Sequence, residues 1–274
     1  GSLTLTAGKD GIHAENADDT TRGFVYIAGG TVTVTCDGDG VDAGATAQIK
    51  NGILTITAGG GSANATQKKE EMFGPGGWNQ SSSTTTDEES TSAKGIKSAG
   101  DLTISGGSIT VDAADDALHS NANATISGGS FTLATGDDGL HADDNTAISG
   151  GTITISQSYE GIEGKTIAIS GGNITLTASD DGLNAAGGND QSGFGGGMRP
   201  DTFSSGDSDC SITISGGKII INADGDGIDS NGNLYVTGGE TYVSGPTNGG
   251  NGALDYDGEA TITGGIVVAA GSTG

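Results

Sequence analysis

Acidic residues recur along the sequence at a nearly constant interval, and their spacing points most directly to chemistry. Asp116, Asp138, Glu160 and Asp181 follow one another at steps of 21 or 22 residues. A fold that stacks successive repeats would place these carboxylates above one another at the strand spacing of about 4.8 Å. At that distance two carboxylates repel by roughly 3 to 4 kcal/mol at an effective dielectric constant of about 20, so the stack needs relief.

Bound cations would relieve this repulsion. The acids form three pairs: Asp115 with Asp116, Asp137 with Asp138, and Asp180 with Asp181. Ca²⁺ prefers oxygen ligands, and the short Asp side chain suits a cation cage at a turn. We therefore expect Ca²⁺ at some of these positions. In the alternative interpretation the acids are solvated turn residues that hydrogen-bond to the backbone.

A second set of polar residues lies near these acids, three positions further along in most repeats. Its members are His13, Asp42, Lys97, His119, His141, Glu163, Asn184, Asp229 and Asp255. All 3 histidines of the chain belong to this set. We expect the set to face outward, either as a lane that contacts a ligand or as a structural stack. A transition-metal site at His119 and His141 is a weaker interpretation, because no soft ligand completes it.

The elements that must position these residues are short strands of a repeat of about 22 residues. A Gly-Gly step, as at Gly106-Gly107 and Gly128-Gly129, keeps phase with the acidic step. Each repeat then predicts three strands, for example at residues 102–104, 109–111 and 118–119. Their alternating apolar and polar residues give one buried and one wet face, and stacking buries a continuous aliphatic column.

This pattern predicts an all-β fold, a single right-handed parallel β-helix domain spanning residues 1–274. The repeat allows about nine coils. Two segments interrupt the period, at about residues 59–92 and 187–209, and are predicted to be lateral loop insertions. Their Gly-, Ser- and Thr-rich composition cannot pack a core of its own.

Composition narrows the classes of partner. The formal net charge is -25, which argues against direct electrostatic binding of nucleic acid or an anionic membrane. No segment approaches the ~20 apolar residues of a membrane span, so we expect no membrane insertion.

Cys36 and Cys210 are predicted to lie too far apart for a disulfide and to be buried thiols. The richness in Thr, Ser, Asn and Gly favours an extracellular or cell-surface location, while the oligomeric state stays open.

The repeated Ser-Gly-Gly-x-Ile-Thr-Ile and Asp-Asp-Gly-Leu-His-Ala segments resemble those of the calcium-binding parallel β-helix carbohydrate-binding proteins, which are themselves similar to family-nine polysaccharide lyases. The resemblance covers residues 3–268. It implies an exported protein that binds plant cell-wall polysaccharide, including acidic pectin and cellulose, with Ca²⁺ and without established catalysis. The metal ligands that it implies are Asp115, Asp116, Asp137, Asp138, Asp180, Asp181, Asp39, Asp42, Asp226 and Asp229. Lys94 and Glu160 depart from the pattern.

Two classes of function follow. In the first, a non-catalytic module binds polygalacturonate because Ca²⁺ bridges protein and uronate carboxylates, whereas cellulose would need exposed aromatic rings. The residues expected to contact the ligand are His119, His141, Lys97, Glu163, Asn184, Tyr159 and Trp78.

In the second class of function, a Ca²⁺-dependent pectate lyase uses Lys97 or Lys94 as its base. Neighbouring carboxylates would raise the pKa of such a lysine, the wrong direction for a base. A surface adhesin or scaffold is a lesser alternative.

Overall fold

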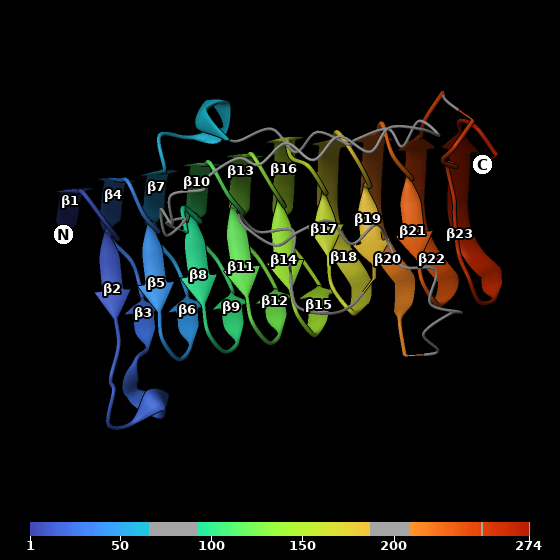
Figure 1. The fold of residues 1–274 in the computed structure, drawn as a ribbon. Helices are drawn as coiled ribbons and strands as arrows, with labels where there is room; N and C mark the ends of the chain where they lie inside the picture. The colour runs from blue at the N-terminus through green and yellow to red at the C-terminus, as the bar shows by residue number, and fades with distance from the viewer. Residues whose placement is uncertain (66–91, 187–208, 248, 274) are drawn as a thin grey trace, which may run out of the picture.

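The chain folds as a parallel β-helix in the computed structural model, which describes residues 1–65, 92–186, 209–247 and 249–273. Its coils succeed one another along one axis from the N-terminus to the C-terminus (Figure 1). Most of both predicted insertions, including Trp78, lies outside the described residues. Within the described part of the chain, no helix has the length and apolar character needed to span a membrane.

Three strands build most coils, as the sequence predicts. The first strands are β3 (Val25–Ile27), β6 (Ala47–Ile49), β9 (Leu102–Ile104), β12 (Ala124–Ile126) and β15 (Asn145–Ile148). The second strands are β1 (Ser2–Ala7), β4 (Thr31–Cys36), β7 (Ile53–Ala58), β10 (Ser108–Ala113), β13 (Ser130–Thr135) and β16 (Thr152–Gln157). The two sets belong to one 15-stranded sheet, in which neighbouring coils pair in parallel.

The third strands form a separate parallel sheet of 8 strands (Figure 1). They are β2 (Ile12–Ala14), β5 (Val41–Ala43), β8 (Ile96–Ser98), β11 (Leu118–Ser120), β14 (Leu140–Ala142), β17 (Ile162–Glu163), β19 (Leu183–Ala185) and β21 (Ile228–Ser230). Two short 3₁₀ helices, η1 (Thr20–Arg22) and η2 (Ser62–Asn64), lie between strands.

The later coils differ from the predicted pattern because their first and second strands join. The joined strands are β18 (Thr166–Ala178), β20 (Ser211–Ala223), β22 (Asn233–Ser244) and β23 (Ala260–Ala270). The pairing register still shifts at the Gly-Gly step, as between Ile169 and Asn173. The second glycine of the step adopts a positive φ, 103° at Gly107 and 110° at Gly129, which residues with a side chain rarely adopt. The Gly-Gly step therefore marks a corner even where the strand continues.

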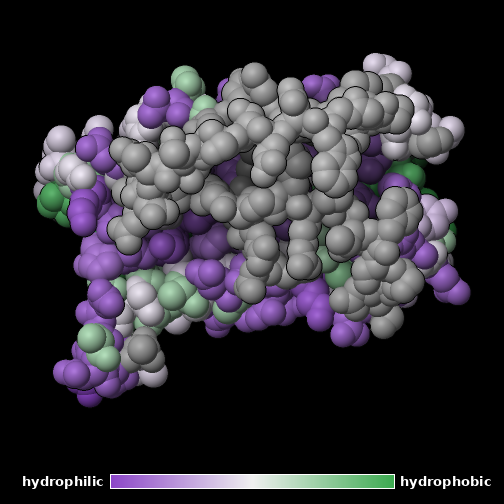
Figure 2. All heavy atoms as spheres, viewed as in Figure 1, coloured by the Kyte–Doolittle hydropathy of each residue, from purple (hydrophilic) through white to green (hydrophobic). Residues whose placement is uncertain are grey.

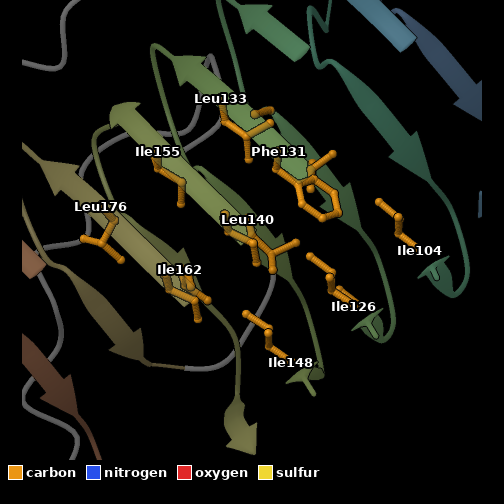
Figure 3. Close-up of a cluster of buried hydrophobic side chains, with 14 of the residues drawn as sticks. Ile104, Ile126, Phe131, Leu133, Leu140, Ile148, Ile155, Ile162 and Leu176 are labelled. Carbon is orange, nitrogen blue, oxygen red and sulfur yellow. The ribbon is translucent and has the colours of Figure 1, made fainter. Parts of the chain in front are cut away.

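The core is a set of aliphatic columns that run along the axis of the helix. Ile104, Ile126 and Ile148 stack in one column, from neighbouring first strands (Figure 3). Another column contains Ile109, Phe131 and Ile153, and Phe131 is among the largest fully buried side chains. Burial of each such side chain contributes roughly 1.5 to 3 kcal/mol, so every coil depends on its neighbours for stability.

Most corners before the third strands have a glycine directly after the corner residue, while Ala117 takes this position after Asp116. A Cβ atom at Gly40 would lie 2.5 Å from the carbonyl oxygen of Gly95 in the next coil. Glycine therefore allows the coils to approach closely at this corner. The same close approach brings the acidic residues of successive coils together. Cys36 and Cys210 are both buried, and they form no disulfide with each other, as predicted.

Candidate functional site

The acidic residues that precede the third strands are superimposed along the axis. In each coil the backbone N–H of the following residue donates a hydrogen bond to the backbone carbonyl of the residue at the corresponding position in the next coil. Gly95 donates to the Asp116 carbonyl at 2.8 Å, and Ala117 donates to that of Asp138 at 2.9 Å. Gly161 donates to the carbonyl of Asp181 at 2.8 Å. We call these positions the acidic corner; a lysine, Lys94, takes one of them, and the acids at the others are Asp10, Asp39, Asp116, Asp138, Glu160, Asp181 and Asp226.

Several carboxylates at or beside the acidic corner are withdrawn from water. The buried ones are Asp39, Asp116, Asp137, Asp138 and Asp181, while Asp42, Asp115, Asp180, Asp226 and Asp229 are partly exposed. An ionised carboxylate removed from water is strongly destabilised unless a cation or hydrogen-bond donors compensate its charge. Burial thus argues against the interpretation that all of these acids are solvated turn residues.

Lys94 supplies the compensating charge at one coil. Its Nζ lies 2.9 Å from Oδ1 of Asp115 and 2.6 Å from Oδ2 of Asp116. Burial lowers the pKa of Lys94, but the two carboxylates outweigh that effect and raise it above its ordinary value. The departure from the repeat at Lys94 therefore places an ammonium group among the acids.

Asp116 is held in its ionised form. Burial raises the pKa of Asp116, but Lys94 and then His119 outweigh it, so that the pKa falls well below its ordinary value. Its Oδ2 lies 2.7 Å from Nδ1 of His119, and its Oδ1 accepts a hydrogen bond from the backbone N–H of Asp138 at 3.0 Å. Asp115, Asp116 and Asp137 offer oxygens within 4.8 Å of one another, and Lys94 contacts the first two.

Asp138 and Glu160 lack such compensation. Oδ1 of Asp138 is buried and has no hydrogen-bond partner among the described residues, while Oδ2 lies 3.3 Å from Nδ1 of His141. Burial, together with the charge of Asp137, raises the pKa of Asp138 well above its ordinary value. Burial and the charge of Glu163 do the same to the pKa of Glu160. These two coils therefore favour bound protons or a cation.

A second group of three carboxylates lies further along the chain. Asp181, Asp226 and Asp229 offer carboxylate oxygens within 4.8 Å of one another. Burial and the charges of Asp180 and Asp229 raise the pKa of Asp181 to about 9. A purely carboxylate donor set suits a hard cation such as Ca²⁺, so these residues fit the ion that the sequence predicts. Asp180 is adjacent to this group in the chain but does not belong to it.

The N-terminal corners are arranged differently from the prediction. Nζ of Lys97 lies 3.3 Å from Oδ2 of Asp39 and 3.8 Å from Oδ1 of Asp42, so a lysine takes the expected metal position. Asp42 also groups with Asp10 and His13, whose ligand atoms lie within 4.8 Å of its own. Asp10 was not among the predicted ligands, although its Asp-Gly dipeptide is the first of the repeat.

The polar set of the third strands is in register, but its middle is not exposed as predicted. His119 pairs with Lys97 on one side and His141 on the other, and Glu163 pairs with Asn184. The exposed fraction is only 3% for His119 and 0% for His141. The two rings stack on each other with centroids 4.7 Å apart. Carboxylate oxygens lie within hydrogen-bonding distance of their ring nitrogens. Among the described residues, these two buried rings are therefore not exposed for direct contact with a polysaccharide.

Two further predicted contact residues are Asn184, on β19 of the same sheet, and Tyr159, in the turn before β17. Nδ2 of Asn184 donates to Oε2 of Glu160 at 3.0 Å, and within the described ranges of the chain its buried Oδ1 has no hydrogen-bond partner. Tyr159 connects the corners on either side, because its N–H donates to Asp137 and its carbonyl accepts from Asp180. Hydrophilic residues predominate where described atoms are visible on this face (Figure 2).

A model of the carbohydrate-binding domain-containing protein family matches residues 1–139. The chain belongs to this family. The comparisons with curated proteins and with solved structures gave no match. The matched residues include the part of the acidic corner from Asp10 to Asp138. They also include His119 of the stacked pair. Membership supports a carbohydrate-binding role and points to binding rather than catalysis.

Proposed function

We propose that this domain binds acidic plant cell-wall polysaccharide, with polygalacturonate as the preferred ligand, through Ca²⁺ held at the acidic corner. The proposal includes an exported, extracellular or cell-surface location and no catalytic step. The observation that carries it is the group of Asp181, Asp226 and Asp229, three close carboxylates that fit a hard cation. Family membership supplies the carbohydrate part of the proposal.

The charge of the chain favours a bridging cation. At a formal net charge of -25, the domain repels a polyuronate, and the repulsion grows as the polymer approaches the acidic corner. A Ca²⁺ ion has enough coordination positions to take oxygens from the protein and from a uronate at once. The same carboxylates that oppose binding without the ion would then hold the ligand.

Cellulose is the weaker part of the proposal. Binding of a neutral glucan uses aromatic faces and hydrogen bonds rather than a cation. Within the described residues, Phe24 and Tyr26 are exposed at 58% and 50% near the N-terminal coils, and Tyr256 is exposed at 43% near the C-terminal end, so the exposed rings are divided between the two ends of the chain. We therefore rank polygalacturonate above cellulose.

The lysines do not favour the lyase alternative. Lys94 is buried between Asp115 and Asp116, which raise its pKa and keep it protonated. Lys97 forms ion pairs with Asp39 and Asp42. A general base must be unprotonated and within reach of the proton that it removes. Neither arrangement supports that role.

Calorimetric titration of the chelator-treated domain with Ca²⁺, followed by polygalacturonate, tests the proposal. We expect Ca²⁺ uptake, polymer binding only after Ca²⁺ is added, and no growth of the ultraviolet absorbance of unsaturated uronate. Asp226→Asn should weaken both steps, whereas Asp257→Asn, which removes the same charge from an exposed position, should not.

Other outcomes would contradict separate parts of the proposal. Polymer binding that is unchanged by chelator would overturn the role of Ca²⁺. Growth of the unsaturated product would show catalysis. Binding of cellulose with no binding of polygalacturonate would overturn the proposed ligand class.

A further inference from the structure

Two histidines from neighbouring coils form a parallel pair. His119 lies on β11 and His141 lies on β14, and the two residues are in register. Their ring centroids are 4.7 Å apart, and their planes differ by only 5°. Both residues are buried, so the rings are fixed by their surroundings rather than by solvent.

Carboxylates hold the same edge of each ring. Nδ1 of His119 lies 2.7 Å from Oδ2 of Asp116, and Nδ1 of His141 lies 3.3 Å from Oδ2 of Asp138. Glu163 also contacts Nδ1 of His141. Because the rings are parallel and each Nδ1 faces the acid three residues before it, the two Nε2 atoms lie on the same opposite edge. A histidine that ligates a metal through one nitrogen is commonly oriented in this way by a carboxylate at the other.

Asp143 completes the group on that edge. Its Oδ1 lies 3.1 Å from Nε2 of His141. His119, His141 and Asp143 each offer a ligand atom within 4.8 Å of the others. Within the described part of the chain, Nε2 of His119 has no hydrogen-bond partner. The sequence did not supply this third ligand, because Asp143 lies beyond the end of β14, outside the repeated columns.

We propose that His119, His141 and Asp143 bind a transition-metal ion of the Zn²⁺ class, at a site separate from the acidic corner. Two imidazole nitrogens and one carboxylate oxygen are a donor set that suits Zn²⁺ and leaves its fourth position open. Ca²⁺ prefers oxygen ligands alone and is therefore disfavoured here. Ligand atoms around tetrahedral Zn²⁺ lie about 3.3 Å apart, so the rings must tilt toward each other when the ion binds.

The surrounding charges favour a dication at this position. Oδ2 of Asp138 lies 3.3 Å from Nδ1 of His141, Glu163 contacts the same nitrogen, and Oδ1 of Asp143 lies 3.1 Å from Nε2. Carboxylates thus lie at both nitrogens of this ring, and their negative charge attracts a metal ion.

His13 provides an internal comparison. It groups with Asp10 and Asp42, but this group contains one imidazole, and the side chain of His13 is 44% exposed. No second histidine lies beside it, because its register partner is Asp42. The His13 group should therefore bind Zn²⁺ more weakly than the paired histidines.

Calorimetric titration with ZnCl₂ in excess Ca²⁺ tests the site. The full domain should take up one tightly bound Zn²⁺ for each chain. His119→Asn and Asp143→Asn each remove a proposed ligand and should weaken Zn²⁺ binding by about tenfold or more. A tenfold loss is the smallest expected even for a residue that only supports a ligand. His13→Asn should leave Zn²⁺ binding unchanged. This result would be independent of whether the domain binds polygalacturonate.

Nuclear magnetic resonance of the unaltered domain avoids the risk that a buried-histidine variant fails to fold. Zn²⁺ should shift the imidazole signals of His119 and His141 and leave those of His13 in place. Shifts confined to His13, no Zn²⁺ uptake, or displacement of Zn²⁺ by equimolar Ca²⁺ would each overturn the proposal.

Discussion

Lys94 shows how a single residue can replace a cation in the acidic corner. Its ammonium lies within hydrogen-bonding distance of Asp115 and Asp116, and Asp116 is fully buried. Lys94→Met keeps an unbranched side chain but leaves the acids without their partner. Removal of one member of a buried ion pair costs roughly 3 to 5 kcal/mol, so we expect a loss of that size in the free energy of unfolding. Urea unfolding at neutral pH measures it.

Lys50→Met is the matched control, because Lys50 is exposed. An exposed substitution of this kind should change the free energy of unfolding by about 0.5 kcal/mol or less. Equal losses in the two variants would contradict the importance of the buried pair.

Asp181 makes stability depend on pH. Burial, Asp180 and Asp229 raise its pKa from 3.8 to about 9 in the folded chain. As the pH rises from about 4 toward 9, the unfolded chain releases this proton while the folded chain retains it. The free energy of unfolding of the chelator-treated protein should therefore fall across this range. Thermal unfolding at about pH 5 and about pH 8 measures the change.

Asp181→Asn should flatten this dependence, because the amide does not titrate. Asp257→Asn, at an exposed position, should retain it. A steep fall that persists unchanged in Asp181→Asn would assign the dependence to other groups.

The sequence predicted the candidate site in part. Period and residue type were enough to stack Asp116 on Asp138 and His119 on His141, because parallel coils repeat the same side-chain direction. Period could not show that Lys97 turns toward Asp39, or that Asp143 reaches His141. Those contacts depend on side-chain rotamers and on residues outside the regular strands, which repeat spacing does not specify.

At the scale of the strand, Phe131 tests how far each coil depends on its neighbours. The ring on β13 lies between Ile109 of β10 and Ile153 of β16 and is 1% exposed. Phe131→Ala should leave a cavity in three successive coils and cost about 3 to 5 kcal/mol. The midpoint and slope of urea unfolding measure this loss.

Phe24→Ala removes the same side chain from a position that is 58% exposed. Its free energy of unfolding should change little, because few contacts are lost. If the two substitutions destabilised the protein equally, the proposed importance of the buried column would be wrong.

The strand pattern was largely predictable, and its exceptions have a physical cause. Residues 102–104, 109–111 and 118–119 fall within β9, β10 and β11, because apolar alternation and glycine corners define each segment. The same cues could not predict that β18, β20, β22 and β23 run through the Gly-Gly step. Glycine permits both a break and a continued strand, so pairing with the neighbouring coil decides between them.

At the scale of the whole molecule, the surplus of negative charge should make stability depend on divalent cations. A ligand that binds only the folded chain stabilises it by about 2.7 kcal/mol at a free concentration of one hundred times its dissociation constant. On the proposed function, Ca²⁺ should therefore raise the thermal midpoint of the chelator-treated domain. Differential scanning calorimetry with increasing CaCl₂ measures this shift.

Mg²⁺ at the same ionic strength is the control, because it demands stricter octahedral geometry and releases its water reluctantly. It should raise the midpoint less than Ca²⁺ does. Equal effects of both salts would assign the stabilisation to general screening of the charge.

The stacking of one acid on the next also makes the corner behave as a one-dimensional lattice. The pKa of Glu160 depends on the charge of both Asp138 and Asp181, so occupancy at one position changes the affinity at the adjacent ones. Protons and cations should accordingly be taken up over a broad range rather than in a single sharp step. Lys94 interrupts this lattice as a fixed positive charge. It divides the corner into an N-terminal segment at Asp10 and Asp39 and a longer segment from Asp138 to Asp226, and we expect these two segments to take up ions independently of each other.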